Sequence, residues 1–102
     1  MDIEHWNKAW GELTEKNMRK ILESRGYSVI KFVYPPGTYF PDHAHAFDKM
    51  DTVLKGKFKI EALAKKLILR PGDILYVPSG TVHNAEVVGS EEVISLDASK
   101  VD

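Results

Sequence analysis

The chain has 102 residues, of which 43% are hydrophobic and 28% charged, and its formal net charge is −1. This length and composition predict a single globular domain and argue against a dedicated nucleic-acid binder, which usually carries a strong basic excess. The absence of cysteine excludes disulfide scaffolds, thiolate zinc fingers and cysteine nucleophiles. No apolar run approaches the roughly 18 residues of a membrane span, and the charged N-terminus does not resemble a signal peptide. We therefore expect no membrane partner, no nucleic-acid partner and, by default, a cytoplasmic location.

The first part of the chain predicts a helix over residues 14–25. Thr14 is a good N-cap, and Gly26 suits the position just past the helix end. The apolar residues between them recur at helical spacing, which gives one narrow apolar face. We expect residues 1–26 to form an N-terminal helical extension that covers one end of the core.

After Gly26 the hydrophobic period changes from 3.6 to 2, and turn residues separate a series of short apolar runs. These runs predict strands over residues 27–34, 38–40, 50–54, 57–63, 67–69, 74–77, 82–88 and 93–96. Closely spaced strands without a further helix are typical of a β-sandwich or barrel. We expect residues 27–102 to form one all-β domain.

Three of the four histidines stand where strand geometry can bring them together. His43 and His45 are two residues apart, so on an extended chain they point to one face. His83 follows a turn forty residues after His43, and a neighbouring strand could place it beside the first pair. Three neutral imidazoles that converge on one point form a metal site with positions left open for water or substrate. The alternative is three histidines that hold no metal.

Two longer patterns contain these histidines. The first is Gly37-x5-His43-x-His45-x3-Lys49-x6-Gly56, and the second is Gly72-x5-Pro78-x-Gly80-x2-His83. They resemble the two motifs of the cupin superfamily, whose usual forms are G-x5-H-x-H-x3-4-E-x6-G and G-x5-P-x-G-x2-H-x3-N. The resemblance implies a small double-stranded β-helix, or jelly-roll barrel, with the histidines at its mouth. It also implies a divalent metal ion, with Fe, Mn, Ni, Cu and Zn all possible, bound by His43, His45 and His83.

Two positions depart from these motifs. The family glutamate, normally a fourth metal ligand, is Lys49 here, and the final asparagine is Val87. A protonated lysine cannot ligate a cation, and its charge opposes metal binding nearby. Asp51 faces the same way as Lys49 on a regular strand, so it could replace the lost ligand, or the two could pair. Asp48 could also reach the site at a bulge.

Three further interpretations of this motif segment stay open. The barrel could use three histidines and waters alone. Lys49 or Asp51 could serve as a catalytic acid or base. The alternation from residue 39 to residue 51 also places Tyr39 and Phe47 with the histidines, which predicts an aromatic wall for a small-molecule ligand; simple core packing is the alternative for both aromatics.

Three functions follow from these observations. The first is a metal-dependent enzyme acting on a small molecule, an oxygenase or isomerase of cupin type. The second is a non-catalytic barrel that binds or senses a small ligand through a degenerate metal site, which the loss of the glutamate at Lys49 favours. The third is a stable barrel whose histidines are vestigial. In each case we expect a homodimer, because a small barrel with open sheet edges gains by pairing them.

Overall fold

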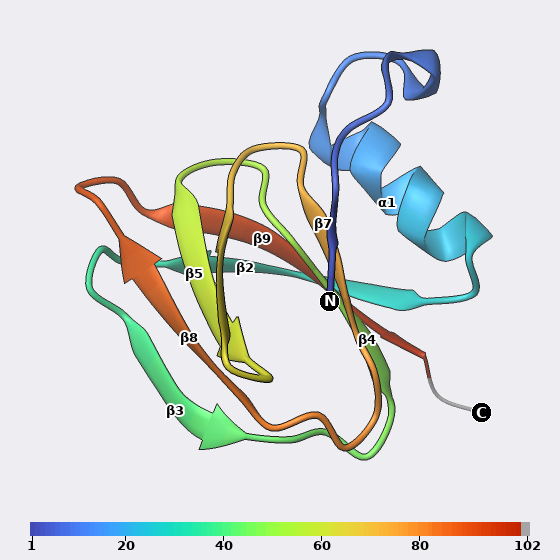
Figure 1. Ribbon diagram of the computed structural model, residues 1–102. Coiled ribbons are helices and arrows are strands. Elements are labelled where there is room, and N and C mark those ends of the chain that lie inside the picture. The colour runs from blue at the N-terminus through green and yellow to red at the C-terminus, as the bar shows by residue number, and fades with distance from the viewer. Residues whose placement is uncertain (101–102) are drawn as a thin grey trace.

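The structure is a computed structural model that describes residues 1–100, and it folds them into two antiparallel sheets that face each other (Figure 1). The first sheet has five strands, in the order β1 (Ile3–Glu4), β7 (Ile74–Val77), β4 (Asp48–Thr52), β9 (Val93–Lys100) and β2 (Ser28–Tyr34). The second has four, in the order β3 (Tyr39–His43), β8 (His83–Val88), β5 (Lys57–Ala62) and β6 (Lys65–Leu69). This architecture confirms the predicted all-β jelly-roll fold.

Every predicted strand is present, as β2 to β9, although several ends differ. The largest difference is in β9, which continues to Lys100 because it pairs with β2 over Val93–Ser99 and with β4 over Asp97–Lys100. Strand β1 lies outside the predicted strands, because its two residues are too few to show an alternating pattern. Ile3 of β1 pairs with Leu75 of β7, so the N-terminal segment contributes a strand as well as a helix. The division of the chain at residue 26 stays a prediction.

The predicted helix is α1 (Glu15–Ser24), and the side chain of Thr14 caps it by accepting a hydrogen bond of 3.1 Å from the backbone N–H of Asn17. Its buried residues, Met18 and Leu22, pack against the five-stranded sheet on the side away from the barrel interior. The helix therefore closes the outer face of that sheet and takes no part in the inner surface. Among residues 1–100, no helix is long and apolar enough to cross a membrane.

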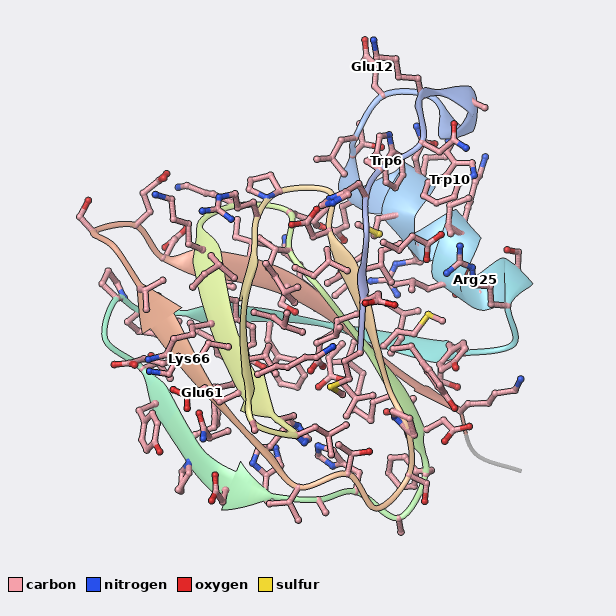
Figure 2. All side chains as sticks on the ribbon, viewed as in Figure 1. Trp6, Trp10, Glu12, Arg25, Glu61 and Lys66 are labelled. Atoms are coloured by element: carbon pink, nitrogen blue, oxygen red, sulfur yellow. The ribbon has the colours of Figure 1, made fainter. Side chains whose placement is uncertain are left out.

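The segment before α1 packs against the rest of the fold through aromatic and ionic contacts (Figure 2). It contains η1, a 3-10 turn over Lys8–Trp10, and the rings of Trp6 and Trp10 meet edge to face with their centroids 5.0 Å apart. The Arg25 guanidinium lies 5.7 Å from the centre of the Trp10 ring and forms a bidentate ion pair with Glu4 at 2.7 and 2.8 Å. The tryptophans therefore anchor the N-terminal segment on the helix.

The space between the sheets is filled by apolar side chains from both of them. The fully buried members include Val53, Ile60, Leu69, Leu75 and Val93. Aromatic rings continue this core toward one end of the barrel, where Tyr34 lies 5.7 Å from Phe58 and 5.0 Å from Phe40 between ring centroids. This aromatic end of the core forms one wall of the cavity described below.

Gly56 is the glycine whose replacement the fold tolerates least. Its φ is +84°, and an added Cβ would lie 2.4 Å from the backbone carbonyl oxygen of Glu92. Gly89 has nearly the same backbone, with φ at +81°, but nothing lies within 4 Å of an added Cβ. We predict that Gly56→Ala lowers the free energy of unfolding by about 1–3 kcal/mol more than Gly89→Ala, since only the first adds a clash to the shared backbone strain.

Urea unfolding of the two variants and the wild-type protein measures this difference. Equal losses for the two alanine variants would show that the neighbouring strand end moves aside at little cost.

Candidate metal centre

The structure brings the three motif histidines together. His43 ends β3 and His83 begins β8, and the two are direct partners in the antiparallel pairing of these strands. His45 lies just after β3, where its carbonyl oxygen accepts a hydrogen bond of 2.9 Å from the backbone N–H of Gly80. One ring nitrogen from each histidine lies within 4.8 Å of those from the other two. A metal–nitrogen bond is about 2.1 Å long, so modest side-chain rotations would bring all three nitrogens to one ion.

Backbone carbonyls fix the tautomer of two of these rings. Nδ1 of His43 lies 2.7 Å from the carbonyl oxygen of Pro41, and Nδ1 of His83 lies 2.9 Å from that of Thr81. A carbonyl oxygen can only accept, so Nδ1 carries the proton in both rings. The lone pair of the neutral imidazole is then on Nε2, which is free to bind a metal.

The surroundings of the cluster favour the neutral form of the imidazoles. Burial lowers the pKa of His45, and the charge of Lys49 lowers it further. Burial is also the main cause that lowers the pKa of His83, although its hydrogen bond to Thr81 opposes the shift. Both rings are therefore neutral at pH 7, the form in which histidine binds metals.

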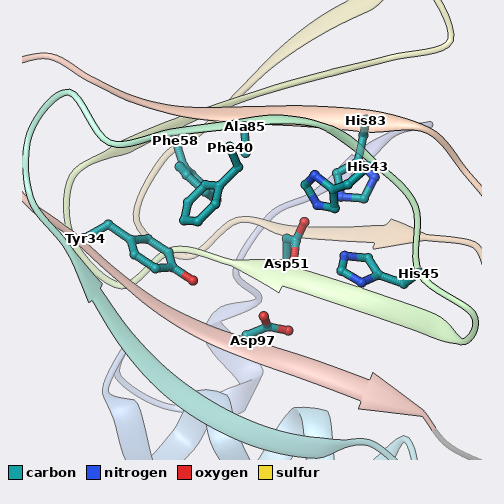
Figure 3. Close-up of a pocket in the computed structure, with 9 residues that line it drawn as sticks. All are labelled: Tyr34, Phe40, His43, His45, Asp51, Phe58, His83, Ala85 and Asp97. Carbon is teal, nitrogen blue, oxygen red and sulfur yellow. The ribbon is translucent and has the colours of Figure 1, made fainter.

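The histidines open onto a cavity of about 150 Å³ between the two sheets (Figure 3). Its lining divides into an apolar half and a polar half. The apolar half consists of Tyr34, Phe40, Phe58 and Ala85, and the polar half consists of His43, His45, His83, Asp51 and Asp97. Such a combination of aromatic surface and a few convergent polar groups is typical of a small-molecule site.

A register shift in β3 produces this lining. Phe40 pairs with Ala85 and His43 pairs with His83, so three steps along β3 match two steps along β8. The extra residue turns Phe40 and His43 to the same side of the sheet, although they are an odd number of positions apart. Without the shift, one of these two side chains would face away from the cavity.

The polar half contains two carboxyl groups that face each other across neighbouring strands. Asp51 of β4 is the direct partner of Asp97 of β9. Burial and the charge of Asp97 raise the pKa of Asp51 to about 7. Asp97 itself forms an ion pair with the Nζ of Lys49, which also donates a hydrogen bond of 2.9 Å to the Ser99 hydroxyl. At pH 7 the pocket therefore holds one ion-paired carboxylate and one carboxyl poised to gain or lose a proton.

Lys49 is placed differently from Asp51. Its side chain is buried at 7% exposure, paired with Asp97 rather than with Asp51, and it is not among the residues that line the cavity. Asp48, considered above as a group that could reach the site, instead accepts a hydrogen bond of 2.8 Å from the backbone N–H of Ser79. Asp51 is thus the only one of these three candidates in the cavity lining.

The two aromatic residues expected to form the pocket wall do not line the cavity. Tyr39 is 55% exposed and Phe47 is 37% exposed. The alternation that grouped them with the histidines assumed a regular strand, and the register shift after Phe40 reverses the side on which Tyr39 lies. Phe47 comes after β3 has ended, and its ring lies beside that of His45 with centroids 6.3 Å apart.

None of the four residues of the apolar half was predicted from the sequence, and neither was one of the two carboxylates. Tyr34 and Asp97 come from β2 and β9, far from either motif in the sequence. Burial raises the pKa of Tyr34 to about 12, with smaller contributions from Asp97 and Asp51, so its hydroxyl remains a donor at neutral pH. The hydroxyl points toward the polar half of the cavity (Figure 3). The sequence signal available for these residues was their place in strands of alternating pattern, which does not identify a pocket.

The family described as Cupin domain matches residues 30–99 of this chain. The chain is 31% identical over 72 residues to the bifunctional lysine-specific demethylase and histidyl-hydroxylase NO66 of Branchiostoma floridae, a match that covers 67% of this chain and 12% of that protein. It is 30% identical over 102 residues to germin-like protein 2-2 of Oryza sativa subsp. japonica, covering 90% of this chain and 46% of that protein. The chain thus spans less than half the length of both relatives.

Solved structures show the same fold. The crystal structure of a cupin-like protein from Thermotoga maritima superposes with a TM-score of 0.66 and 26% sequence identity, covering 74% of this chain and 57% of that one.

The pKa of Asp51 predicts how stability depends on pH. The folded-state pKa of about 7 lies above the ordinary value of 3.8, so between these values the folded state holds a proton that the unfolded state has lost. The contribution of Asp51 to the free energy of unfolding therefore falls as pH rises from about 4 to 7. We predict that Asp51→Asn, measured in the presence of a chelator, makes the change in the free energy of unfolding from pH 5 to pH 8 more favourable by about 1–3 kcal/mol than in the wild-type protein.

Urea unfolding at the two pH values tests this prediction. Asp2→Asn changes an exposed carboxyl and is the matched control, which should behave as the wild-type protein does. A variant Asp51→Asn with an unchanged pH dependence would contradict the assignment of this titration to Asp51.

Proposed function

This chain belongs to the cupin family, and we propose that its three-histidine cluster binds one divalent transition-metal ion and that the adjacent cavity binds a small-molecule ligand. The observation that carries the proposal is the convergence of His43, His45 and His83, with their ring nitrogens within 4.8 Å of one another, on a cavity with an apolar wall.

The donor set fits such an ion. Three imidazoles suit Fe, Mn, Ni, Cu or Zn, and a set of three protein ligands leaves positions open for water or a ligand. Two features of this chain prepare the rings: the carbonyl contacts at Nδ1 of His43 and His83 leave Nε2 free, and burial keeps His45 and His83 uncharged. The positive charge of Lys49, which opposes cation binding, is balanced by its ion pair with Asp97.

The cavity residues supply binding and proton transfer. A bound divalent ion would act there as a Lewis acid or, if redox-active, as an electron-transfer centre. Phe40 and Phe58 hold the apolar part of the ligand and exclude water, and Asp51 accepts a proton from a ligand hydroxyl. Asp51 suits this role better than Lys49, because it lines the cavity and its pKa of about 7 lies near neutral pH.

These roles are those of a metal-dependent enzyme acting on small molecules, of oxygenase or isomerase type. The name of the Branchiostoma floridae relative, a demethylase and hydroxylase, supports oxygenase chemistry. One observation favours a second function, a non-catalytic barrel that binds or senses a small ligand: Lys49 stands where the motif has its glutamate, so the centre lacks that carboxylate ligand.

Metal content tests the proposal directly. We predict that protein purified without a histidine tag carries up to one equivalent of a transition metal by elemental analysis. Replacing His43 or His83 by alanine should lower that content at least about tenfold, because each change removes one of three ligands. His5→Ala is the matched control, since that ring lies 2.7 Å from Asp73 and outside the cluster.

Metal-free wild-type protein that also shows no thermal shift with Fe²⁺, Mn²⁺, Ni²⁺, Cu²⁺ or Zn²⁺ would rule the metal centre out and leave the histidines as vestigial residues of a stable barrel. An alanine variant at His43 that retains its metal would move the centre away from the cluster.

The role of Asp51 has its own test. We predict that Asp51→Asn retains the metal content of the wild-type protein, because Asp51 is not part of the cluster whose atoms lie within 4.8 Å. A tenfold loss of metal in this variant would instead make Asp51 the carboxylate ligand that replaces the motif glutamate. Loss of turnover with unchanged metal content would support proton transfer and distinguish the enzyme from the binding barrel.

A further inference from the structure

The charged groups around the cavity indicate which ligands it can take. Its polar half carries two carboxyl groups, those of Asp51 and Asp97, and among residues 1–100 no lysine or arginine side chain lines it. The ammonium group of Lys49 contacts Asp97 and donates to the Ser99 hydroxyl, so it is already used within the protein. A ligand that enters the cavity therefore meets carboxyl groups without meeting a side-chain cation.

This arrangement opposes an anionic ligand. A buried carboxylate is tolerated only when a positive or hydrogen-bond-donating group pairs with it. With no side-chain cation in the lining of the described chain, a ligand carboxylate could find a positive partner only in the metal ion. Any part of it that reaches past the ion would lie against the Asp97 carboxylate, and like charges repel strongly where water is excluded.

Ligand groups that donate hydrogen bonds suit the same positions. Lys49 contacts Oδ1 of Asp97, which leaves Oδ2 to accept a hydrogen bond from a ligand. Asp51 is the direct cross-strand partner of Asp97, and the Cβ atoms of such partners lie about 5 Å apart. Two carboxyl groups at this spacing can each accept a hydrogen bond from one of two neighbouring donors on a single ligand.

The apolar half limits the size and shape of the ligand. A cavity of about 150 Å³ is large enough for one benzene-sized ring. The rings of Phe40 and Phe58 stand at 90° to each other with centroids 6.3 Å apart, and the ring of Tyr34 packs against both. The Tyr34 hydroxyl points toward the polar half (Figure 3), where it can donate to a ligand oxygen. Aromatic walls of this kind favour a ligand that is itself a ring.

We propose that the cavity takes an uncharged one-ring ligand with two adjacent hydrogen-bond donors, such as a vicinal diol, and rejects carboxylate ligands of the same size. This inference rests on the proposed small-molecule function of the cavity and adds the residues that select the ligand. One donor binds Asp51 and the other binds Asp97, while the ring packs on the aromatic wall. Asp97 contributes most to the rejection of anions, because its ion pair with Lys49 holds the carboxylate in place.

Three probes of one ring each test this preference. Catechol and salicylamide are uncharged at pH 7 and carry two adjacent donors, whereas salicylate has the shape of salicylamide with a carboxylate in place of the amide. All three can bind zinc through oxygen. We expect calorimetry on the zinc-loaded wild-type protein to give dissociation constants for both uncharged probes at least about tenfold below that for salicylate, because only salicylate meets like-charge repulsion.

Two results on the wild-type protein would overturn the proposal. Salicylate that binds as tightly as salicylamide would show that the carboxyl groups do not select against anions. Absence of binding by both uncharged probes would show that the cavity does not take this class of ligand. Neither result depends on a variant that has to fold.

Replacement of Asp97 tests which residue carries the selectivity. Asp97→Asn keeps the shape of the side chain and removes its charge, so salicylate should bind at least about tenfold more tightly than it binds the wild-type protein. Asp42→Asn is the matched control, because that exposed carboxyl accepts a hydrogen bond of 2.9 Å from Asn84 and does not line the cavity. Equal gains in the two variants would contradict the role of Asp97.

Zinc uptake is measured first, so that a failure of the metal centre is seen separately. If the wild-type protein takes up no zinc, the proposed metal centre fails, and the probes are compared on the metal-free protein by NMR titration of the Phe58 and Ala85 amides. Both carboxyl groups remain in the lining, so salicylamide should still bind more tightly than salicylate, and the reverse order would overturn this inference as well. A zinc-loaded protein that prefers salicylate would overturn this inference alone.

Discussion

The pairing of His43 with His83 is the constraint on which the candidate centre depends. Antiparallel register makes the two residues direct neighbours, with ring centroids 4.2 Å apart, and the carbonyls of Pro41 and Thr81 orient each ring from its own strand. One extra residue in β3 then turns Phe40 to the same side. A single irregularity in β3 therefore places both a metal-binding side chain and an apolar side chain in the cavity. A change in this register would alter both halves of the cavity at once.

Charge balance in the barrel depends on β4 and β9 in the same way. Their register opposes Lys49 to Ser99 and Asp51 to Asp97, so the lysine reaches one carboxylate diagonally and leaves the other facing the cavity. Buried charges are tolerated only when they are paired and hydrogen-bonded. Lys49 meets this condition through its ion pair with Asp97 and its hydrogen bond to Ser99. Asp97 is paired with Lys49, and Asp51, whose pKa is about 7, is only partly ionised at neutral pH. The exchange of the motif glutamate for lysine is therefore accommodated without a buried uncompensated charge.

Much of the fold and the histidine cluster could be predicted from the sequence. The rest of the cavity lining could not, for physical reasons. Local signals placed α1, because a cap and a helical period lie within twelve residues, and the two motifs identified the histidines by spacing. Tyr39 and Phe47 were assigned to the pocket because alternation was carried through β3 as if it were regular, and a bulge leaves no distinctive residue pattern. Asp97 and Tyr34 were missed because their positions depend on the register between strands that are distant in sequence. The amino-acid sequence alone does not reveal that register.

Strand β2 connects the cavity with the outer edge of the five-stranded sheet. Tyr34 lines the cavity, and its ring stacks on that of Phe32 with centroids 5.7 Å apart. Phe32 is 39% exposed, so this stack runs from the solvent-facing edge to the cavity, where the Tyr34 hydroxyl points toward Asp97 (Figure 3). A change in the position of Phe32 therefore reaches the polar half of the cavity through one aromatic pair.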